Sequence, residues 1–294
     1  MRILWLALAA LLFCACSHQT PLPRRGIVAT TVHLEEIVRA VVGEHRPVEL
    51  LVPRGADPHA FEPSPQDVKK LATCQILFCN GAGLEGWLQR LVQQGLENPD
   101  VVVVDLSRGL PLKTTGHEVD PHIWLDPRLM IRATVTVAEH MARLEPALAP
   151  GYRQRADIHV GRLQELDRWS QERLSRIPKT RRKIVTSHDA LGYFARRYDF
   201  VIEGTVIAGV STEAAETSAA ELQRLVKRIQ ATGTPAIFSE SGQSPRVYEL
   251  LAREAGVKLV PDLFLDSLGP EGSPTATYEG AFRWNVERIA EALQ

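Results

Sequence analysis

The chain has 294 residues, 45% of them hydrophobic, and its formal net charge is only -1. This length is enough for about two domains of ordinary size with buried cores. No basic or acidic block stands out, which argues against nucleic acid as a partner, because phosphate binding needs a concentrated positive face.

The N-terminal segment has the composition of an export signal followed by a tether. A positive charge precedes the apolar run 3–13, and a small residue then precedes Cys16. A run this short is typical of a signal peptide and cannot cross a bilayer as a stable helix. We predict a signal peptide over residues 1–15, lipidation of Cys16, and a tether over residues 16–25 that anchors the protein to a membrane. Ordinary secretion is the alternative.

From Gly26 onward, apolar strand-like segments alternate with helical patterns. The expected strands are 27–31, 48–52, 75–80 and 101–105, and the helices between them include 34–42 and 65–72. Such alternation is typical of βα units on a parallel sheet. We therefore predict a first βα lobe over residues 26–146.

The pattern changes at Pro127, where a helix is expected to begin and to run to about Leu144. A second helical segment, 150–177, has no proline after its start and carries charges throughout. It would span roughly 40 Å. A helix this long and polar suits a bridge between two lobes better than burial inside one. We assign residues 147–177 to a rigid linking helix.

Pro178 ends this helix, and the alternation of strands and helices resumes. The expected strands are 183–186, 201–206, 236–239 and 257–260, and the expected helices are 222–230, 248–255 and 281–293. Residues 178–294 are therefore predicted to form a second βα lobe. The predicted fold is α/β, with two lobes of mostly parallel sheet joined by one long rigid helix.

Two cysteines remain in the predicted mature chain, Cys74 and Cys79 in addition to Cys16. Export permits a disulfide between them. However, the residues between them are typical of a strand, which would hold the sulfur atoms roughly 16 Å apart, too far for a bond. We predict two free, buried thiols.

Residues 81–86 (GAGLEG) match the G-x-G-x-x-G pattern of dinucleotide-binding sites. They follow an expected strand and open a helix, and Asp105 lies at about the distance of the acidic residue in such sites. However, Glu85 would place a carboxylate where pyrophosphate binds, and no lysine or arginine in the loop offsets it. Export would also separate the chain from cytosolic cofactors. We therefore favour a structural turn.

Three of the nine histidines lie at positions that suit a binding site. His59 follows the expected strand 48–52, His188 follows the strand 183–186, and His122 lies in the sequence DPHIWLDP. In open α/β sheets, ligands bind beyond the carboxyl ends of the strands. Asp-Pro-His occurs twice, and the proline stiffens the backbone before the imidazole. These three histidines predict one buried transition-metal site.

Carboxylates are expected to complete and support this site. Asp262 and Asp266 both follow the last expected strand, and spacing alone does not select between them as a fourth ligand. Asp57, Asp120 and Asp189 lie next to the three histidines and could orient the imidazoles through their second ring nitrogens.

At this point the sequence resembles a known family, the zinc/manganese-binding solute-binding lipoproteins of ABC importers, also described as TroA-like metal-binding receptors. The resemblance extends over essentially the whole mature chain. It rests on five segments, which are 57–65 (DPHAFEPSP), 80–87 (NGAGLEGW), 120–127 (DPHIWLDP), 187–194 (SHDALGYF) and 266–269 (DSLG).

The resemblance implies a metal held in the cleft between the two lobes. Its implied ligands are two from each lobe, namely His59, His122, His188 and Asp266. Asp266 is preferred to Asp262 because it lies in the Asp-Ser-Leu-Gly segment. The resemblance also implies that Glu240 supports the ligands from beside the site. In this family the glycine motif is a structural turn, and the long helix limits hinge closure.

The function implied by the resemblance is high-affinity capture of a divalent metal in the periplasm or at the cell surface, with delivery to the permease of an ABC importer. Some members carry Glu in place of His188 and tend toward manganese. Three imidazoles with one carboxylate favour zinc, with manganese as the alternative. His117 stands alone where many zinc-specific members carry a His-rich loop. We expect a monomeric receptor that is not an enzyme.

Two other functions compete with this one. Three histidines and a water form a catalytic zinc pattern, but H-E-x-x-H is absent and a carboxylate as fourth ligand closes the site against a hydrolase. A role as an adhesin-like surface protein has been assigned to members of the family. Neither a repeat nor an aromatic patch in this sequence supports it.

Overall fold

The computed structural model describes residues 26–93, 100–115, 118–212 and 217–294. The predicted signal peptide, tether and lipidation site at Cys16 lie outside the described residues, as does His117. None of the helices in the described ranges combines the length and apolar character that a membrane crossing requires.

The first part of the chain builds a four-stranded parallel sheet with the strand order β2-β1-β3-β4. Its strands are β1 (Gly26–Ala29), β2 (Val48–Leu50), β3 (Cys74–Cys79) and β4 (Val102–Asp105). Its helices are α1 (Val32–Val42), α2 (Pro65–Thr73) and α3 (Gly86–Gln93). We call the part around this sheet the first lobe.

The later part of the chain repeats this arrangement, with the strand order β10-β9-β7-β8. Its strands are β7 (Lys183–Thr186), β8 (Val201–Thr205), β9 (Ala236–Glu240) and β10 (Lys258–Leu263). Its helices are α6 (Gly192–Tyr198), α7 (Ala219–Thr232), α8 (Arg246–Ala255) and α9 (Tyr278–Leu293). We call this part the second lobe. In both sheets the strand that comes first in the chain lies between the second and the third.

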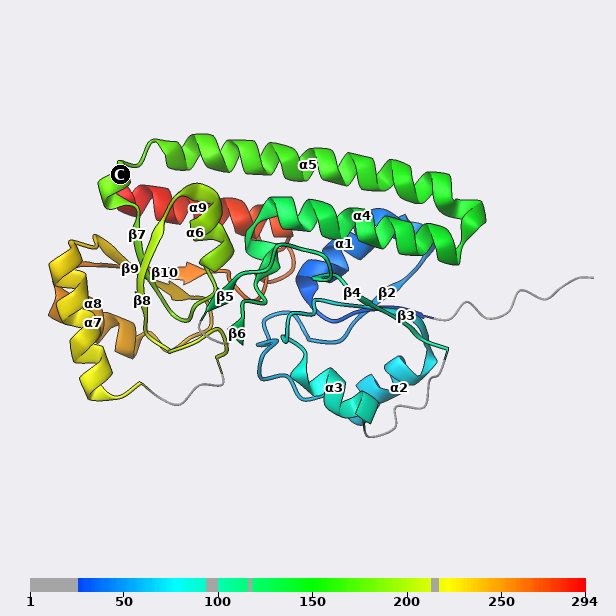
Figure 1. Cartoon of the computed structure of the whole chain (residues 1–294), viewed down its shortest axis with the longest axis horizontal. Coiled ribbons are helices and arrows are strands. Elements are labelled where there is room, and N and C mark those ends of the chain that lie inside the picture. The colour runs from blue at the N-terminus through cyan, green and yellow to red at the C-terminus, as the bar shows by residue number, and fades with distance from the viewer. Residues whose placement is uncertain (1–25, 94–99, 116–117, 213–216) are drawn as a thin grey trace, which may run out of the picture.

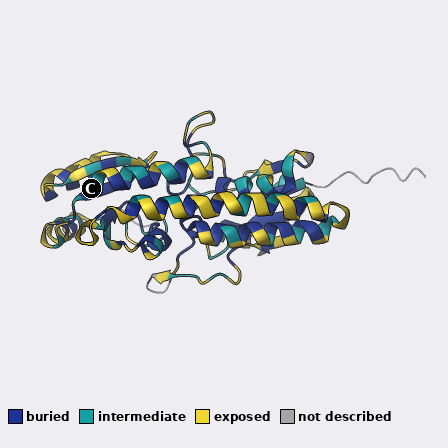
Figure 2. Ribbon diagram, turned by 90° about the horizontal axis from the view of Figure 1, so that it is seen from above, coloured by how far each residue is buried: buried dark blue, intermediate teal, exposed yellow. Residues whose placement is uncertain are grey.

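Two helices connect the lobes, and in the sequence they lie between the strands of the first sheet and those of the second. Helix α4 (Pro127–Leu144) begins where predicted, because Asp126 accepts the Arg128 N–H and proline fills the first position. Helix α5 (Ala149–Ser175) runs across both lobes (Figure 1) and packs on α1, α4 and α9. Its inward side buries apolar residues such as Tyr152 and Leu166, while its outward side is exposed (Figure 2).

The largest apolar cluster of the described residues extends through both lobes. It joins residues of the first sheet, such as Phe78, to residues of the second, such as Phe238, through Trp124 and the helices beneath α5. Because close-packed interiors resist deformation, this shared core limits how far the lobes can move apart. The α/β fold of two parallel sheets and a long helix is confirmed, whereas the predicted domain boundaries remain predictions.

Three smaller features complete the comparison with the sequence. Cys74 and Cys79 are buried thiols that are not joined in a disulfide, as predicted. The short helix α6 was not predicted. Neither was an antiparallel hairpin made of β5 (Thr114–Thr115) and β6 (Glu118–Val119).

Candidate metal centre

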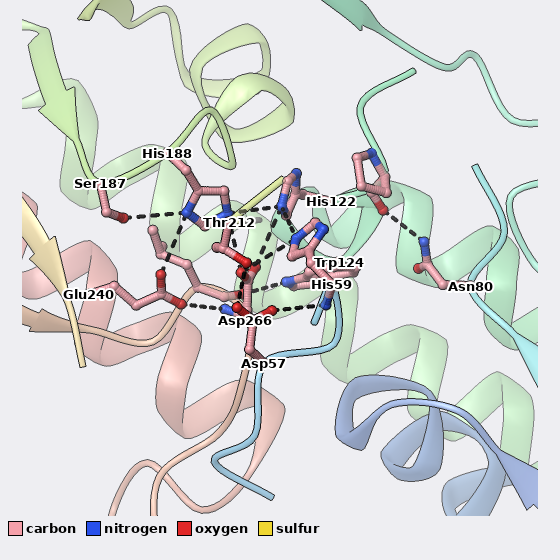
Figure 3. Close-up of polar contacts among 12 residues, drawn as sticks. Asp57, His59, Asn80, His122, Trp124, Ser187, His188, Thr212, Glu240 and Asp266 are labelled. Atoms are coloured by element: carbon pink, nitrogen blue, oxygen red, sulfur yellow. Dashed lines mark hydrogen bonds and ion pairs between the residues drawn. The ribbon is translucent and has the colours of Figure 1, made fainter. Parts of the chain in front are cut away.

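Four side chains converge between the two sheets (Figure 3). They are the four implied by the family resemblance, namely His59, His122, His188 and Asp266. Each offers one ligand atom, and these atoms all lie within 4.8 Å of one another. His59 is half-buried and the other three are buried. The alternative ligand, Asp262, is exposed and outside this cluster.

The spacing of these atoms fits one tetrahedral ion. The Nε2 atom of His122 lies 3.2 Å from that of His59 and 3.1 Å from that of His188. Asp266 Oδ2 lies 3.5 Å from Nε2 of His59 and 3.2 Å from Nε2 of His188, and its Oδ1 lies 3.5 Å from Nε2 of His122. Four ligands bonded to zinc at about 2.0–2.1 Å stand about 3.3 Å apart in a tetrahedron.

The segment that carries His122 is fixed from two sides. Asp120 Oδ1 accepts the backbone N–H of His122 at 3.0 Å and lies 2.8 Å from its ring Nδ1. The Asn80 side chain, at the end of β3, donates to the Pro121 carbonyl at 2.8 Å. Asp120 therefore orients this imidazole as expected, and a proton on Nδ1 leaves Nε2 free to bind a metal.

The first Asp-Pro-His segment uses its aspartate differently. Asp57 Oδ1 accepts the backbone N–H of His59 at 2.8 Å, which repeats the turn at Asp120. Its other oxygen accepts a hydrogen bond from the hydroxyl of Thr212, which belongs to the second lobe. Asp57 thus fixes the backbone of His59 and joins it to the opposite lobe. The sequence suggested that Asp57 orients the imidazole of His59, but the described contacts do not pair the two side chains.

Glu240, at the end of β9, supports the two candidate ligands of the second lobe. Its Oε2 lies 3.6 Å from Nδ1 of His188, and its Oε1 accepts the backbone N–H of Asp266 at 3.0 Å. The Ser187 hydroxyl lies 3.4 Å from the same Nδ1. The expected partner, Asp189, instead lies 4.0 Å from Nζ of Lys113. Sequence proximity suggested Asp189, but the sheet brings Glu240 to the ring.

The electrostatics of the cluster call for a positive charge. Burial alone would raise the pKa of Asp266, but the three neighbouring histidines, His188 foremost, together outweigh it and hold this pKa well below its usual range. Burial would lower the pKa of His188, but Asp266 and Glu240 raise it to about 9. Burial lowers the pKa of His122. A buried carboxylate facing three imidazoles is therefore stabilised by a proton on His188 or by a cation in its place.

Both carboxylate oxygens of Asp266 are buried and lack a well-oriented hydrogen-bond donor among the described residues. Burying a carboxylate whose oxygens accept no well-oriented hydrogen bond is costly, so its surroundings fit a cation. A cavity of about 430 Å³ opens beside His59 and is also lined by Trp87 and Glu118. A smaller cavity of about 200 Å³ borders Asp266 and Glu240. These cavities provide space for an ion to approach the cluster.

The glycine motif forms a structural turn in this fold. A side chain at Gly81 would overlap the carboxylate of Asp105, and the residue has a φ of 78°, which suits glycine. The buried Glu85 carboxylate accepts the N–H groups of Asn80 and Gly81 at 2.7 and 3.0 Å, and the Thr30 hydroxyl at 2.6 Å. Glu85 therefore occupies backbone donors that a phosphate would need.

Three residues near the cluster were not assigned a role from the sequence. His33 is buried and stacks on Trp124 with ring centroids 4.9 Å apart. The Thr212 hydroxyl donates a hydrogen bond to the Asp57 carboxylate. Tyr193 lies within segment 187–194, on which the family resemblance partly rests. The first two gave no signal, because a lone histidine in a helix or a lone threonine in a loop is common. For Tyr193 the matched segment was the signal.

Two similar α/β lobes around three histidines and one aspartate define a two-lobed binding protein with a candidate metal centre. The family model described as "Zinc-uptake complex component A periplasmic" (ZnuA) matches residues 27–292, and the chain belongs to this family. The resemblance inferred from the sequence is thereby confirmed.

Individual relatives agree with this family over nearly their whole lengths. The chain is 30% identical to the manganese-binding lipoprotein MntA of Bacillus subtilis, over 91% of this chain and 89% of the relative. It is 29% identical to the metal ABC transporter substrate-binding lipoprotein SloC of Streptococcus mutans, over 96% and 94%. The solved structure of the periplasmic zinc binding protein TroA from Treponema pallidum superimposes with a TM-score of 0.84 at 30% identity, covering 92% of this chain and 99% of that one.

Proposed function

We propose that the protein captures a divalent transition metal outside the cytoplasm and delivers it to an ABC importer. The observation that carries this proposal is the set of three imidazoles and one carboxylate, buried between the lobes at the spacing of a tetrahedral ion. Relatives that are named metal ABC transporter substrate-binding lipoproteins support the same function.

Zinc is the proposed cargo, with manganese as the alternative. Nitrogen-rich donor sets suit zinc, whereas manganese prefers oxygen ligands and a higher coordination number. The names of the relatives support both metals, since MntA is named for manganese and TroA for zinc. The donor set of this chain is therefore the basis of the preference.

A receptor fits this centre better than a zinc hydrolase. A catalytic zinc keeps one position open for water, usually with three protein ligands. Here four protein side chains lie at tetrahedral spacing, which leaves a four-coordinate ion without that position. We further propose that the mature protein is a monomer, anchored through a lipid on Cys16, that docks on the permease of the importer.

The first test compares Asp266→Asn with Asp262→Asn in a competition titration against a chromophoric zinc chelator. Asp266→Asn is expected to weaken zinc binding by more than the 10–100-fold typical of losing a supporting residue. Asp262→Asn, at an exposed position near the end of β10, should bind zinc like the wild type. Equal affinities for both variants would remove Asp266 from the ligand set.

The identity of the cargo needs a second experiment, because zinc outcompetes manganese at most such sites in vitro. We expect zinc in protein purified from its native envelope and analysed for metals, and a zinc affinity far above the manganese affinity in titrations. Manganese in the native protein would overturn the zinc assignment and leave the receptor function in place. Turnover of a hydrolysable substrate by the zinc-loaded protein would contradict the receptor proposal.

A further inference from the structure

The hairpin of β5 and β6 ends in an unusual pair of residues. In the register of this hairpin, Lys113 faces Asp120, and such an antiparallel pair normally exchanges two backbone hydrogen bonds. One is present, from the Asp120 N–H to the Lys113 carbonyl at 2.9 Å. In place of the other, the Tyr193 hydroxyl accepts the Lys113 N–H at 3.1 Å and donates to the Asp120 carbonyl at 2.7 Å. The tyrosine is therefore inserted into the ladder.

This insertion lies one step from the candidate metal centre. Asp120 is fully buried, and its carboxylate holds both the backbone N–H and the ring Nδ1 of His122. Tyr193 lies on α6, which begins shortly after His188 in the second lobe. The hydroxyl thus connects a first-lobe candidate ligand to the segment that carries a second-lobe one, and their Nε2 atoms are only 3.1 Å apart.

The surroundings of Tyr193 suit this bridging role. The side chain is fully buried, and the Arg196 guanidinium lies over its ring at 5.0 Å. Burial raises the pKa of Tyr193 to about 12, so its hydroxyl keeps the proton that it donates. The preceding Gly192 permits the close approach, because a side-chain carbon there would lie 2.3 Å from Oδ2 of Asp120.

We propose that Tyr193 is a positioning residue of the metal centre, whose hydroxyl sets the orientation of Asp120 and, through it, of His122. It holds a ligand of the first lobe in register with His188 of the second. This inference rests on the proposed metal-binding function and deepens it.

The test compares Tyr193→Phe with a matched control, Tyr198→Phe. Tyr198 is also buried on α6, and its hydroxyl donates to Asp167 of α5 at 3.0 Å, away from the hairpin. Tyr193→Phe loses the two hydrogen bonds of its hydroxyl, and Tyr198→Phe loses the bond to Asp167, so a purely structural role predicts a loss of stability in both variants and no loss of zinc affinity confined to Tyr193→Phe. We expect Tyr193→Phe to raise the zinc Kd about 10-fold, as for other residues that orient a ligand, and Tyr198→Phe to leave it unchanged.

Two further measurements separate positioning from a loss of stability. The visible absorption spectrum of the Co²⁺-loaded protein reports ligand geometry, and it should change in Tyr193→Phe and remain that of the wild type in Tyr198→Phe. In an Asp120→Ala background, Tyr193→Phe should add little further loss of zinc affinity, because its effect passes through Asp120. Fully additive losses would overturn the proposal, as would equal zinc affinities and Co²⁺ spectra in the two tyrosine variants.

A second variant keeps the proposal testable should Tyr193→Phe fail to fold. Gly192→Ala places a methyl group against the Asp120 carboxylate and should weaken zinc binding without removing any hydroxyl. Unchanged affinity in folded Gly192→Ala would contradict the proposed control of Asp120. If the wild-type chain itself bound no zinc, the proposed function would fail instead, so the two failures are distinguishable.

Discussion

At the scale of single residues, His33 shows how burial sets the charge of a side chain. Its ring stacks on Trp124 and meets Tyr278 edge-on, and its Nδ1 has no hydrogen-bond partner among the described residues. Burial lowers the pKa of His33 to about 3. The histidine is therefore neutral in the folded protein at any pH at which the protein is expected to work.

This shift predicts how stability depends on pH. In the unfolded chain His33 titrates near its usual pKa of about 6.5. Between about pH 6.5 and 3, the unfolded state binds a proton that the folded state does not, so His33 lowers stability as the pH falls. His33→Phe keeps the stacking and should flatten the pH dependence of the urea midpoint in this window. The control is His140→Phe, which replaces a half-buried histidine of α4. Equal pH slopes of the urea midpoint in the two variants would contradict the assignment of this dependence to His33.

The contacts of the candidate centre were only partly predictable from the sequence. Asp120 was expected to orient His122 because two residues of an Asp-Pro-His turn must lie close together. The partner of His188 could not be found this way, because Glu240 reaches it from another strand of the same sheet. Sequence spacing identifies contacts within a turn, whereas contacts across a sheet require the strand order.

At the scale of secondary-structure elements, the sequence predicted long and strongly patterned segments best. Helix α4 has the predicted limits because Asp126 and Pro127 mark its start chemically. Helix α6 was missed because it has only seven residues, and so short a helix depends on tertiary packing. The hairpin strands β5 and β6 have two residues each, too few to show an alternating pattern.

The turn between β3 and α3 gives a prediction at this scale. Removing the Glu85 carboxylate leaves the N–H groups of Asn80 and Gly81 and the Thr30 hydroxyl without their buried acceptor. Each of the three orphaned groups costs about 1–3 kcal/mol, so Glu85→Ala should lower the free energy of unfolding by at least about 3 kcal/mol. Urea denaturation of the metal-free protein measures this. The exposed Glu118→Ala is the control, and a loss no larger than in that control would contradict the role of Glu85.

At the scale of the whole molecule, the two lobes are joined both by their shared core and by polar contacts around the centre. The polar contacts between the loop that carries His59 and the second lobe include the following three hydrogen bonds. Arg54 donates to the Ala276 carbonyl at 2.8 Å, and the Gly55 N–H donates to the Ser267 hydroxyl at 2.7 Å. The third joins Thr212 to Asp57. The sequence indicated two lobes, but such contacts depend on how the lobes face each other.

The contact of Thr212 with Asp57 is the one that bears directly on a candidate ligand, because the other oxygen of Asp57 holds the backbone N–H of His59. Thr212→Val keeps the shape of the side chain and removes the hydroxyl, so the loop of His59 loses a bond that exists only while the lobes are together. Zinc should then dissociate about fivefold faster, the equivalent of one hydrogen bond of about 1 kcal/mol. Association should be unchanged, because encounter precedes formation of this bond.

Stopped-flow mixing of the zinc-loaded protein with excess chelator measures the dissociation rate in this comparison. Thr217→Val is the matched control, because the Thr217 hydroxyl donates to the Val206 carbonyl within the second lobe. This control should release zinc at the wild-type rate, since its lost bond does not cross between the lobes. Equal release from Thr212→Val and Thr217→Val would show that this interlobe bond does not retain the metal. A slower association of zinc with Thr212→Val would instead mean that the bond between Thr212 and Asp57 forms before zinc binds. That result would contradict the expectation that the bond acts only on dissociation.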